Sequence, residues 1–422
     1  MAINVLVFPA GEINSVELHD ALCSCVNVKV WGASSIERHG SYVFANYIPD
    51  VPLITDVIFI DYLNNLIIEK QIDCIFPTHD TVAKFLAYNR NKIKAKIVAA
   101  DYETSRICRN KLETYQLFSN FSFAPKIFEK IISYPVFIKP REGQGSVGAK
   151  IINSKEDVPN VDLEQYVICE YLPGEEYTVD CFTDKNGELV SILPRSRKRV
   201  MAGVSVAGQN EKLTPDIVEI AKVLNNRLSF LGLWWFQIKR DVSGNWKLLE
   251  ISTRCAGTMA LSRALGVNLP LLSVYATMGF DVSIELNKYN VQMDSTLIRR
   301  YKIDYNYDTV YIDFDDTITL NNKVNLKAIW FLYQCQNQHK KVILLTKHAK
   351  EIDVTLSSYH IDKGLFNKIV SIKEEEDKFS FITLQNAIFI DNSFKERKSV
   401  FQNLNIPVFD VDGLDVLMDW RV

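Results

Sequence analysis

Three aspartates fall within four positions directly after an apolar strand pattern, in the stretch VYIDFDDTITL at residues 310–320. They are Asp313, Asp315 and Asp316. Like charges this close repel one another, so such a cluster is typically stabilised by a cation or a phosphoryl group. An EF-hand calcium loop is excluded, because Ile318 stands where that loop needs glycine and Val324 where it needs glutamate.

A glycine-rich loop lies in the first half of the chain. FIKPREGQGSVGAKI (137–151) has the G-x-G-x-x-G spacing, and its candidate phosphate-binding residues are Lys139, Gly143, Gly145, Ser146 and Gly148. A dinucleotide-binding loop needs a helix after it, but AKIINS is a strand pattern. A Walker A loop needs adjacent Gly and Lys, which Ala149 separates, and the later kinase motifs are absent. On the motif alone, a flap over nucleotide phosphates and a flexible surface hairpin are equally favoured.

The elements that must position these residues indicate an α/β chain. In the first hundred residues, strand patterns at 4–9, 26–32 and 73–79 alternate with helical patterns, which predicts βαβ units and a parallel sheet. From about 134 to 260, short strands joined by turns predict an antiparallel sheet. Helices are expected over 104–123 and 215–230.

The alternation of strands and helices resumes after a boundary near residue 300. Strands are expected at TVYIDFD, KVILLTK, NKIVSI, NAIFIDN and PVFDVDG, with helices at 325–338 and around 378–386. This pattern predicts a second, smaller unit with a parallel sheet.

The stretches that flank the glycine loop resemble the ATP-grasp superfamily. CEYLPGEEYTVD (169–180) is similar to its adenine hinge and ribose-binding stretch, and WFQIKRDVSGNWKLLEISTRCAG (235–257) to its metal-binding strand pair. Together with the glycine loop, in this order, they make residues 1–300 similar to ATP-grasp proteins of the carbamoyl-phosphate synthetase large-subunit type. The resemblance implies a Rossmann-like pre-ATP-grasp domain over 1–100 and an α+β ATP-grasp domain over 101–300.

That resemblance also implies a role for each motif residue. ATP-grasp enzymes phosphorylate a carboxylate and then let a nucleophile displace phosphate from the acyl phosphate. The implied roles are phosphate binding by Lys111, Lys139 and the glycine loop; adenine reading near Glu170 and Leu172; ribose binding by Glu176; Mg²⁺ ligation by Gln237, Glu250 and Ser252; and stabilisation of the transferring phosphoryl group by Arg254 and Arg197, with Arg195 and Arg199 as second choices. Ser252 departs from the family's usual asparagine, and a serine oxygen reaches less far, so the second magnesium site depends on this position. Glu12 and the pair His79–Asp80 are candidates for the acceptor site, and simple turn chemistry explains them equally well.

Four stretches of the second unit resemble the haloacid dehalogenase (HAD) phosphatase superfamily. The matches, in order, are Asp313 and Asp315 after the first strand, Thr346 at the end of VILLTKH, Lys378 in EEDKFSFI with Lys373 as second choice, and Asp391–Asn392 at the end of AIFIDN. The resemblance implies a nucleophilic Asp313, an acid–base Asp315, phosphoryl binding by Thr346 and Lys378, and Mg²⁺ held by Asp313, Asp391 and the Asp315 carbonyl, with Asp316 a bystander. Only 32 residues lie between Asp315 and His348, which leaves no room for a cap domain, so residues 301–422 are expected to form a capless HAD Rossmannoid domain.

The motifs together predict a bifunctional enzyme. One part would join a carboxylate to an amine or ammonia with ATP and Mg²⁺ (or Mn²⁺), and the other would hydrolyse a phosphorylated metabolite. Two alternatives stay open: an ATP-grasp phosphotransferase that does not ligate, and an ATP-grasp ligase whose HAD part only docks a partner. The second alternative predicts lost catalytic aspartates, and these are present.

Composition excludes other classes of function. A net charge of −3 gives no basic footprint for nucleic acid or an anionic membrane. The longest apolar run, at 228–238, is too short to span a bilayer. The eight cysteines are scattered without a CxxC pair, and the N-terminus lacks a signal-peptide pattern. We therefore expect a cytoplasmic protein with small-molecule partners, and a homodimer is compatible with the sequence.

Overall fold

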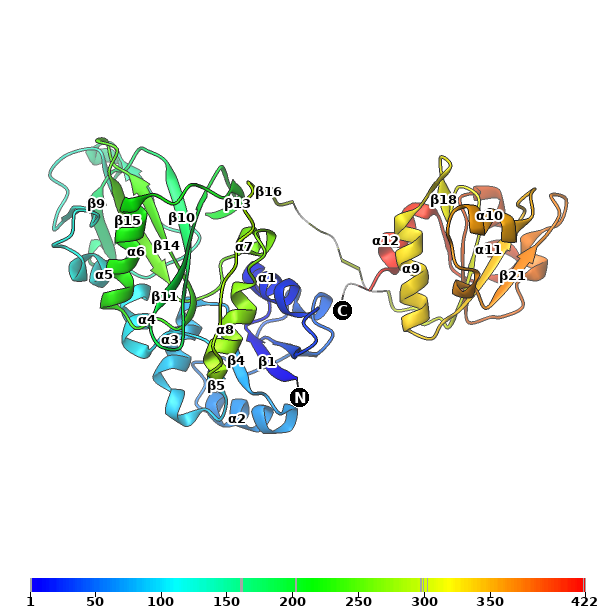
Figure 1. Cartoon of the computed structure of the whole chain (residues 1–422), viewed down its shortest axis with the longest axis horizontal. Helices are drawn as coiled ribbons and strands as arrows, with labels where there is room; N and C mark the ends of the chain where they lie inside the picture. The colour runs from blue at the N-terminus through cyan, green and yellow to red at the C-terminus, as the bar shows by residue number, and fades with distance from the viewer. Residues whose placement is uncertain are drawn as a thin grey trace. The chain divides into compact units, whose positions relative to one another are not determined.

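The computed structural model describes residues 2–159, 162–201, 203–296, 298, 300, 301, 303–419 and 421. The chain forms two compact units, residues 1–297 and residues 298–421 (Figure 1). Among the described residues, no helix is both long and apolar enough to cross a membrane.

The first unit begins with a parallel sheet, as the alternating pattern predicts. Its five strands run in the order β3-β2-β1-β4-β5. They are β1 (Ile3–Phe8), β2 (Val28–Ala33), β3 (Tyr47–Ile48), β4 (Cys74–Pro77) and β5 (Lys96–Ile97). Successive side chains of a strand face opposite sides of the sheet. Val5 and Val7 accordingly pack with α1 (Ile13–Leu22) and α8 (Leu269–Met278), whereas Leu6 and Phe8 pack with α2 (Phe59–Lys70) and α3 (Asp80–Tyr88).

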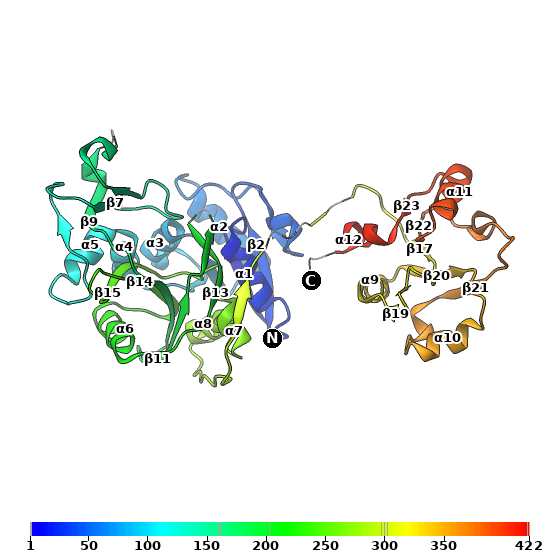
Figure 2. The same cartoon turned by 90° about the horizontal axis from the view of Figure 1, so that it is seen from above.

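Two antiparallel sheets follow, and they face the candidate site. The first has the order β6-β9-β7-β8 and the second β11-β10-β14-β15. Their strands are β6 (Ile127–Phe128), β7 (Val136–Pro140), β8 (Lys150–Ile152), β9 (Tyr166–Glu170), β10 (Glu176–Thr183), β11 (Leu189–Ser196), β14 (Gly232–Arg240) and β15 (Trp246–Ser252). Helix α6 (Pro215–Arg227) packs its apolar stripe against the second sheet around the buried Trp234 and Phe236. Figure 2 shows β7 and β9 apart from β14 and β15.

A smaller sheet and a short helix complete the first unit. Strands β12 (Arg199–Met201), β13 (Val204–Gln209) and β16 (Gln292–Asp294) form the sheet, and the helix is α7 (Ala260–Ala264). One hydrophobic core joins Val5 and Val7 of the parallel sheet to Leu233 and Trp235 of β14. The finer division of this unit at residue 100 stays a prediction.

The single helix predicted over 104–123 is wrong. The structure has two short helices there, α4 (Tyr102–Arg109) and α5 (Lys111–Leu117). Asn110 interrupts them in an extended conformation, and its side chain accepts hydrogen bonds from the amides of Leu112 and Glu113 at 3.1 and 3.4 Å. An asparagine in this role caps a new helix, which places Lys111 at the first position of α5.

The second unit is also built on a parallel sheet, in the order β21-β20-β17-β22-β23. Its strands are β17 (Thr309–Ile312), β20 (Lys341–Thr346), β21 (Lys368–Ser371), β22 (Ala387–Ile390) and β23 (Val408–Phe409), and a hairpin of β18 (Thr319–Leu320) and β19 (Lys323–Val324) follows β17. The helices are α9 (Leu326–Asn337), α10 (Ile352–Ser358), α11 (Phe394–Leu404) and α12 (Leu414–Leu417). Val310 and Ile312 pack with α9, α10 and α12, while Tyr311 faces α11.

One helix predicted for this unit is wrong, and the interval expected to be too short for a cap domain is fully described. The stretch 378–386 forms only a short 3₁₀ turn, Lys378–Phe381. In the continuously described stretch 303–419, the interval from Asp315 to His348 holds only the β18–β19 hairpin, α9 and β20. No inserted domain lies in that interval.

Candidate functional site

A cavity of about 220 Å³ opens between the two antiparallel sheets of the first unit. Eleven residues predicted from sequence line it: Lys111, Lys139, Gly143, Gly145, Ser146, Glu170, Leu172, Glu176, Arg197, Gln237 and Glu250. A second cavity of about 110 Å³ shares Lys111, Arg197 and Glu250 with the first and is also lined by Ser252 and Arg254. Gly148 lines neither cavity. The two cavities therefore adjoin across a shared set of charged side chains.

Two buried lysines extend into this region. The Lys139 ammonium donates to the Leu249 carbonyl at 2.9 Å, and burial lowers the pKa of Lys139. The Lys111 ammonium lies 3.3 Å from the Gly143 carbonyl and 3.6 Å from Glu250 Oε2. Because buried ammonium groups strongly favour anionic neighbours, the pair is suited to bind phosphate oxygens.

A polar network joins the strands β10, β14 and β15. Gln237 lies opposite Glu250 in the register of β14 and β15. With its amide oriented to satisfy both atoms, Gln237 donates to Glu250 over 3.2 Å and accepts from Arg197 over 2.8 Å. Arg197 also pairs with Glu176 at 2.7 Å. Burial lowers the pKa of Arg197, and the carboxylates of Glu176 and Glu250 oppose that effect.

Asp80 holds the two polar side chains at the end of β15. It accepts from the Ser252 hydroxyl at 2.6 Å and from Arg254 Nε at 2.9 Å. Burial disfavours its charge, but Arg254, the Ser252 hydroxyl and Arg109 together lower the pKa of Asp80 to about 2. Asp80 follows β4 at the carboxyl edge of the parallel sheet and is the first residue of α3, a position that favours an anion. The Ser252 hydroxyl, predicted as a metal ligand, thus donates to a carboxylate here.

The glycine loop contacts the β12–β13 hairpin. A Cβ atom on Gly203, which has φ +76°, would lie 2.2 Å from the carbonyl carbon of Gly145. Gly145 and Ser146 themselves have φ of 60° and 57°. Only glycine at 203 permits this approach, so the two loops close over the cavity as a pair.

The arginines of PRSRKR differ sharply in their surroundings. Arg195 is buried and forms a bidentate pair with Asp180 at 2.7 and 3.0 Å, and Arg199 is half-exposed beside Asp294. Arg197 alone of the three lines both cavities.

Sequence reasoning missed two residues of the smaller cavity. The Arg109 guanidinium donates to the Gly143 carbonyl at 3.0 Å. Thr178 is 1% exposed, and its hydroxyl has no hydrogen-bond partner among the described residues. Thr178 could have been found, because alternation along β10 places it on the same face as Glu176.

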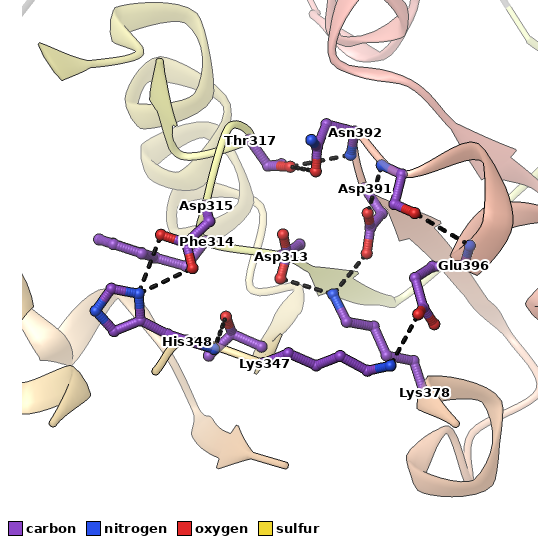
Figure 3. Close-up of polar contacts among 12 residues, drawn as sticks. Asp313, Phe314, Asp315, Thr317, Lys347, His348, Lys378, Asp391, Asn392 and Glu396 are labelled. Atoms are coloured by element: carbon purple, nitrogen blue, oxygen red, sulfur yellow. Dashed lines mark hydrogen bonds and ion pairs between the residues drawn. The ribbon is translucent and has the colours of Figure 1, made fainter. Parts of the chain in front are cut away.

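The second unit brings its predicted residues together at the carboxyl ends of two adjacent strands (Figure 3). Asp313 follows β17 and Asp391 follows β22, and these strands pair in parallel. The Lys378 ammonium bridges them, at 2.7 Å from Asp313 and 2.6 Å from Asp391. Burial is the main reason that the pKa of Asp313 rises to about 6 and that of Asp391 also rises. Two buried carboxylates aimed at one cation form a site for positive charge.

Asp315 lies on the other side of Asp313 from this bridge (Figure 3). Its carboxylate oxygens are 2.8 and 3.0 Å from His348 Nδ1. Sequence reasoning did not assign His348 a role, although it follows β20, the other strand beside β17. The Thr346 hydroxyl accepts from the His348 amide at 3.1 Å, and the Thr317 hydroxyl accepts from the Asn392 amide at 3.1 Å.

Comparison with known proteins decides the fold of the first unit. A model of the family "ATP-grasp in the biosynthetic pathway with Ter operon" matches residues 162–300. The biotin carboxylase of Campylobacter jejuni, in a complex with beta-gamma-ATP, superposes with a TM-score of 0.56 at 12% identity, over 67% of this chain and 72% of that one. The first unit has the ATP-grasp fold.

Two curated ligases are similar to this ATP-grasp unit in sequence. The D-alanine–D-alanine ligase of Thermotoga petrophila is 30% identical over 156 residues, which is 33% of this chain and 52% of the ligase. The 3-methyl-D-ornithine–L-lysine ligase of Methanosarcina mazei is 31% identical over 124 residues, 28% of this chain and 32% of that enzyme. The chain spans about half or less of the length of these relatives.

Each unit offers a pair of oxygen-bearing side chains that suits Mg²⁺. No described residues form a group of three or more histidine, cysteine, aspartate or glutamate side chains suited to hold a metal. Magnesium usually binds one or two carboxylates and completes its octahedron with phosphate oxygens and water. Glu250 with Gln237 in the ATP-grasp unit, and Asp313 with Asp391 in the second unit, supply that number of ligands.

Proposed function

We propose that the ATP-grasp unit joins a carboxylate to an amine or ammonia through an acyl phosphate, with ATP as the phosphoryl donor. The observation that carries this proposal is the convergence of Lys111, Lys139 and Arg197 with Glu250 on adjoining cavities beneath a glycine loop. The names of both similar ligases describe the joining of two amino acids, which favours ligation over simple phosphotransfer.

The residues predicted from sequence would divide the reaction among them. Lys111, Lys139 and the loop amides would bind the triphosphate, and the strand end at Glu170 and Leu172 would read the adenine. Glu176 would bind the ribose. Arg197 and Arg254 would stabilise the phosphoryl group in transfer, because fixed cations in a dry site strongly favour developing negative charge. Mg²⁺, held by Glu250 and Gln237, would neutralise phosphate charge; use of Mn²⁺ stays a prediction.

A matched pair of arginine variants tests the assignment. The full chain is incubated with ATP, Mg²⁺ and a metabolite extract, and the products are identified by mass spectrometry. Arg197→Gln should lose roughly 100-fold or more in ADP formation, the scale for one transition-state contact, whereas Arg199→Gln should stay within about threefold because its charge is solvated. Equal losses of ADP formation in the two variants would show that Arg197 does not contact the phosphoryl group in transfer.

The fate of the phosphate separates ligation from phosphotransfer. Once the carboxylate is known, its oxygens are labelled with ¹⁸O. Ligation through an acyl phosphate moves one labelled oxygen to inorganic phosphate, because the nucleophile replaces the C–O bond with a C–N bond. Phosphate retained in the organic product by an Asp313→Asn variant, in which the second unit cannot hydrolyse it, would establish a phosphotransferase.

We propose that the second unit is a phosphatase of the capless HAD type that acts on a phosphorylated metabolite. The Asp313–Lys378–Asp391 bridge supports this proposal. Asp313 would attack phosphorus while the ester P–O bond breaks and the leaving oxygen takes a proton from Asp315. Water would then lose a proton to Asp315, attack phosphorus and release Asp313. Fusion to the ligase would raise the local concentration of a shared intermediate.

A generic phosphate ester tests this second activity. Hydrolysis should disappear in Asp313→Asn and persist in Glu250→Gln, since Glu250 belongs to the other unit. Asp316→Asn is a matched control, because Asp316 is exposed and its φ of 51° suits asparagine. Hydrolysis that survives Asp313→Asn would leave only the docking role for this unit.

A further inference from the structure

Among the residues that the structure describes, the side chain that contacts the Asp315 carboxyl group is a histidine, His348. The Asp315 side chain is 54% exposed, whereas His348 is 12% exposed. The contacts of 2.8 and 3.0 Å allow His348 Nδ1 to donate to the Asp315 carboxylate whenever that group is ionised. The exposed acid is therefore held by a group that is itself nearly buried.

His348 is fixed from several directions. Its Nε2 atom lies 2.9 Å from the Thr355 hydroxyl of α10. Its ring packs edge-on against Phe314, with ring centroids 5.3 Å apart, and Phe314 is 1% exposed. Its backbone amide is bonded to Thr346 at the end of β20. A ring restrained at both nitrogens and by the Phe314 ring has a single orientation, and it transmits this orientation to Asp315.

We propose that His348 is a positioning residue that holds the Asp315 carboxyl group on the open side of Asp313, where it gives a proton to the departing oxygen and then takes one from the attacking water. This inference rests on the proposed phosphatase function. Figure 3 shows Asp313 between two polar groups, with Lys378 and Asp391 on one side and Asp315 with His348 on the other. Without His348, the Asp315 side chain can rotate freely or turn toward the Lys378 ammonium, and the fraction of molecules with the acid in place falls.

A positioning role has a consequence that a purely structural role lacks. Proton donation matters most for an ester whose leaving group is a strong base and little for one whose leaving group is stable as an anion. Phenyl phosphate is of the first kind and 4-nitrophenyl phosphate of the second. Loss of His348 should therefore act selectively on phenyl phosphate.

The test compares turnover of both esters by the full chain with Mg²⁺. His348→Leu should lower kcat/KM for phenyl phosphate by about tenfold or more, part of the usual gain from acid–base catalysis, and kcat/KM for 4-nitrophenyl phosphate by less than about threefold. The ratio kcat/KM is compared because it reports formation of the aspartyl phosphate and excludes the later hydrolysis step, which is the same for both esters. His348→Asn keeps a donor near the Nδ1 position and should restore most of the loss. Thr355→Val removes the partner of Nε2 and should give a smaller loss with the same selectivity, which keeps the test usable if His348→Leu fails to fold. His360→Asn is the control, since His360 is exposed.

The outcomes separate the two proposals. Equal losses on the two esters, or no loss on either, would overturn the positioning role while leaving the phosphatase in place. A wild-type chain that hydrolyses neither ester, or hydrolysis unaffected by Asp313→Asn, would overturn the phosphatase and this inference with it. Selective loss in His348→Leu with rescue in His348→Asn would support it.

Discussion

Replacing Asp80 with asparagine should destabilise the ATP-grasp unit and release Arg254. Asp80 is 14% exposed and accepts hydrogen bonds from both Ser252 and Arg254. Its pKa falls from 3.8 to about 2 in the folded chain. At about 1.4 kcal/mol per pKa unit, this shift corresponds to roughly 2 kcal/mol of stability at pH 7. Asparagine also presents an amide donor toward arginine, so the loss in Asp80→Asn should reach at least about 2 kcal/mol.

The pH dependence gives this prediction a definite sign. A carboxyl group whose folded pKa is lowered contributes its full stabilisation above the unfolded pKa, here 3.8, and loses it as the pH falls through the folded value of about 2. The difference between wild type and Asp80→Asn should therefore be constant from pH 8 to about 5. By pH 3 it should shrink to about half.

Urea unfolding followed by tryptophan fluorescence suits this measurement, because four of the six tryptophans lie in the first unit. Asp281→Asn is the control: Asp281 pairs with Lys185 but is 84% exposed, so its loss should stay below about 1 kcal/mol. ATP-dependent product formation should fall at least about tenfold in Asp80→Asn, because Arg254 loses the group that orients it. A stability difference under about 0.5 kcal/mol at pH 7, or one that persists undiminished at pH 3, would refute the electrostatic reasoning.

Two further substitutions test buried charge and loop contact. Lys378→Met leaves two buried carboxylates without a counter-ion and should lower the unfolding free energy of the second unit by about 3–5 kcal/mol. Urea unfolding, followed by hydrogen exchange of peptides from this unit, measures the loss. Lys373 is exposed, so Lys373→Met should change the unfolding free energy little, and equal losses in the two variants would contradict the bridge. Gly203→Ala should weaken nucleotide binding because its Cβ meets the Gly145 backbone, whereas Gly187→Ala has similar backbone strain at φ +84° but nothing within 4 Å. Titration with an ATP analogue should give a weaker affinity for Gly203→Ala than for Gly187→Ala. Equal affinities of the two variants would exclude a role of the loop contact in nucleotide binding.

Local patterns predicted much of the fold and part of the site. Apolar strand runs alternating with helical patterns correctly indicated both parallel sheets, because βαβ units leave few other arrangements. Gln237 and Glu250, which the resemblance implies as ligands of one metal site, lie opposite each other in the register of β14 and β15. Asn110 was overlooked as a helix cap, so one helix was predicted where two lie. The capping preference of asparagine was the available signal.

Contacts between distant segments could not be predicted in the same way. Asp80 was a candidate because it follows a parallel strand, but its partners Ser252 and Arg254 lie more than 170 residues away, and no local pattern specifies that contact. The Asp315–His348 contact joins the ends of adjacent strands. Strand order, which the sequence leaves open, determines which of the polar strand ends meet.

The two units place functional groups by the same physical means. A side chain expected to act on phosphoryl oxygens or protons, Arg254 in one unit and Asp315 in the other, is bonded to a partner that follows a different strand. Such a partner need not touch the substrate, so its loss should lower kcat more than it raises KM. Asp80→Asn and His348→Leu are therefore expected to share a kinetic pattern, although one removes an anion and the other a hydrogen-bond donor. A rise in KM with unchanged kcat in either variant would place that partner in direct contact with substrate instead.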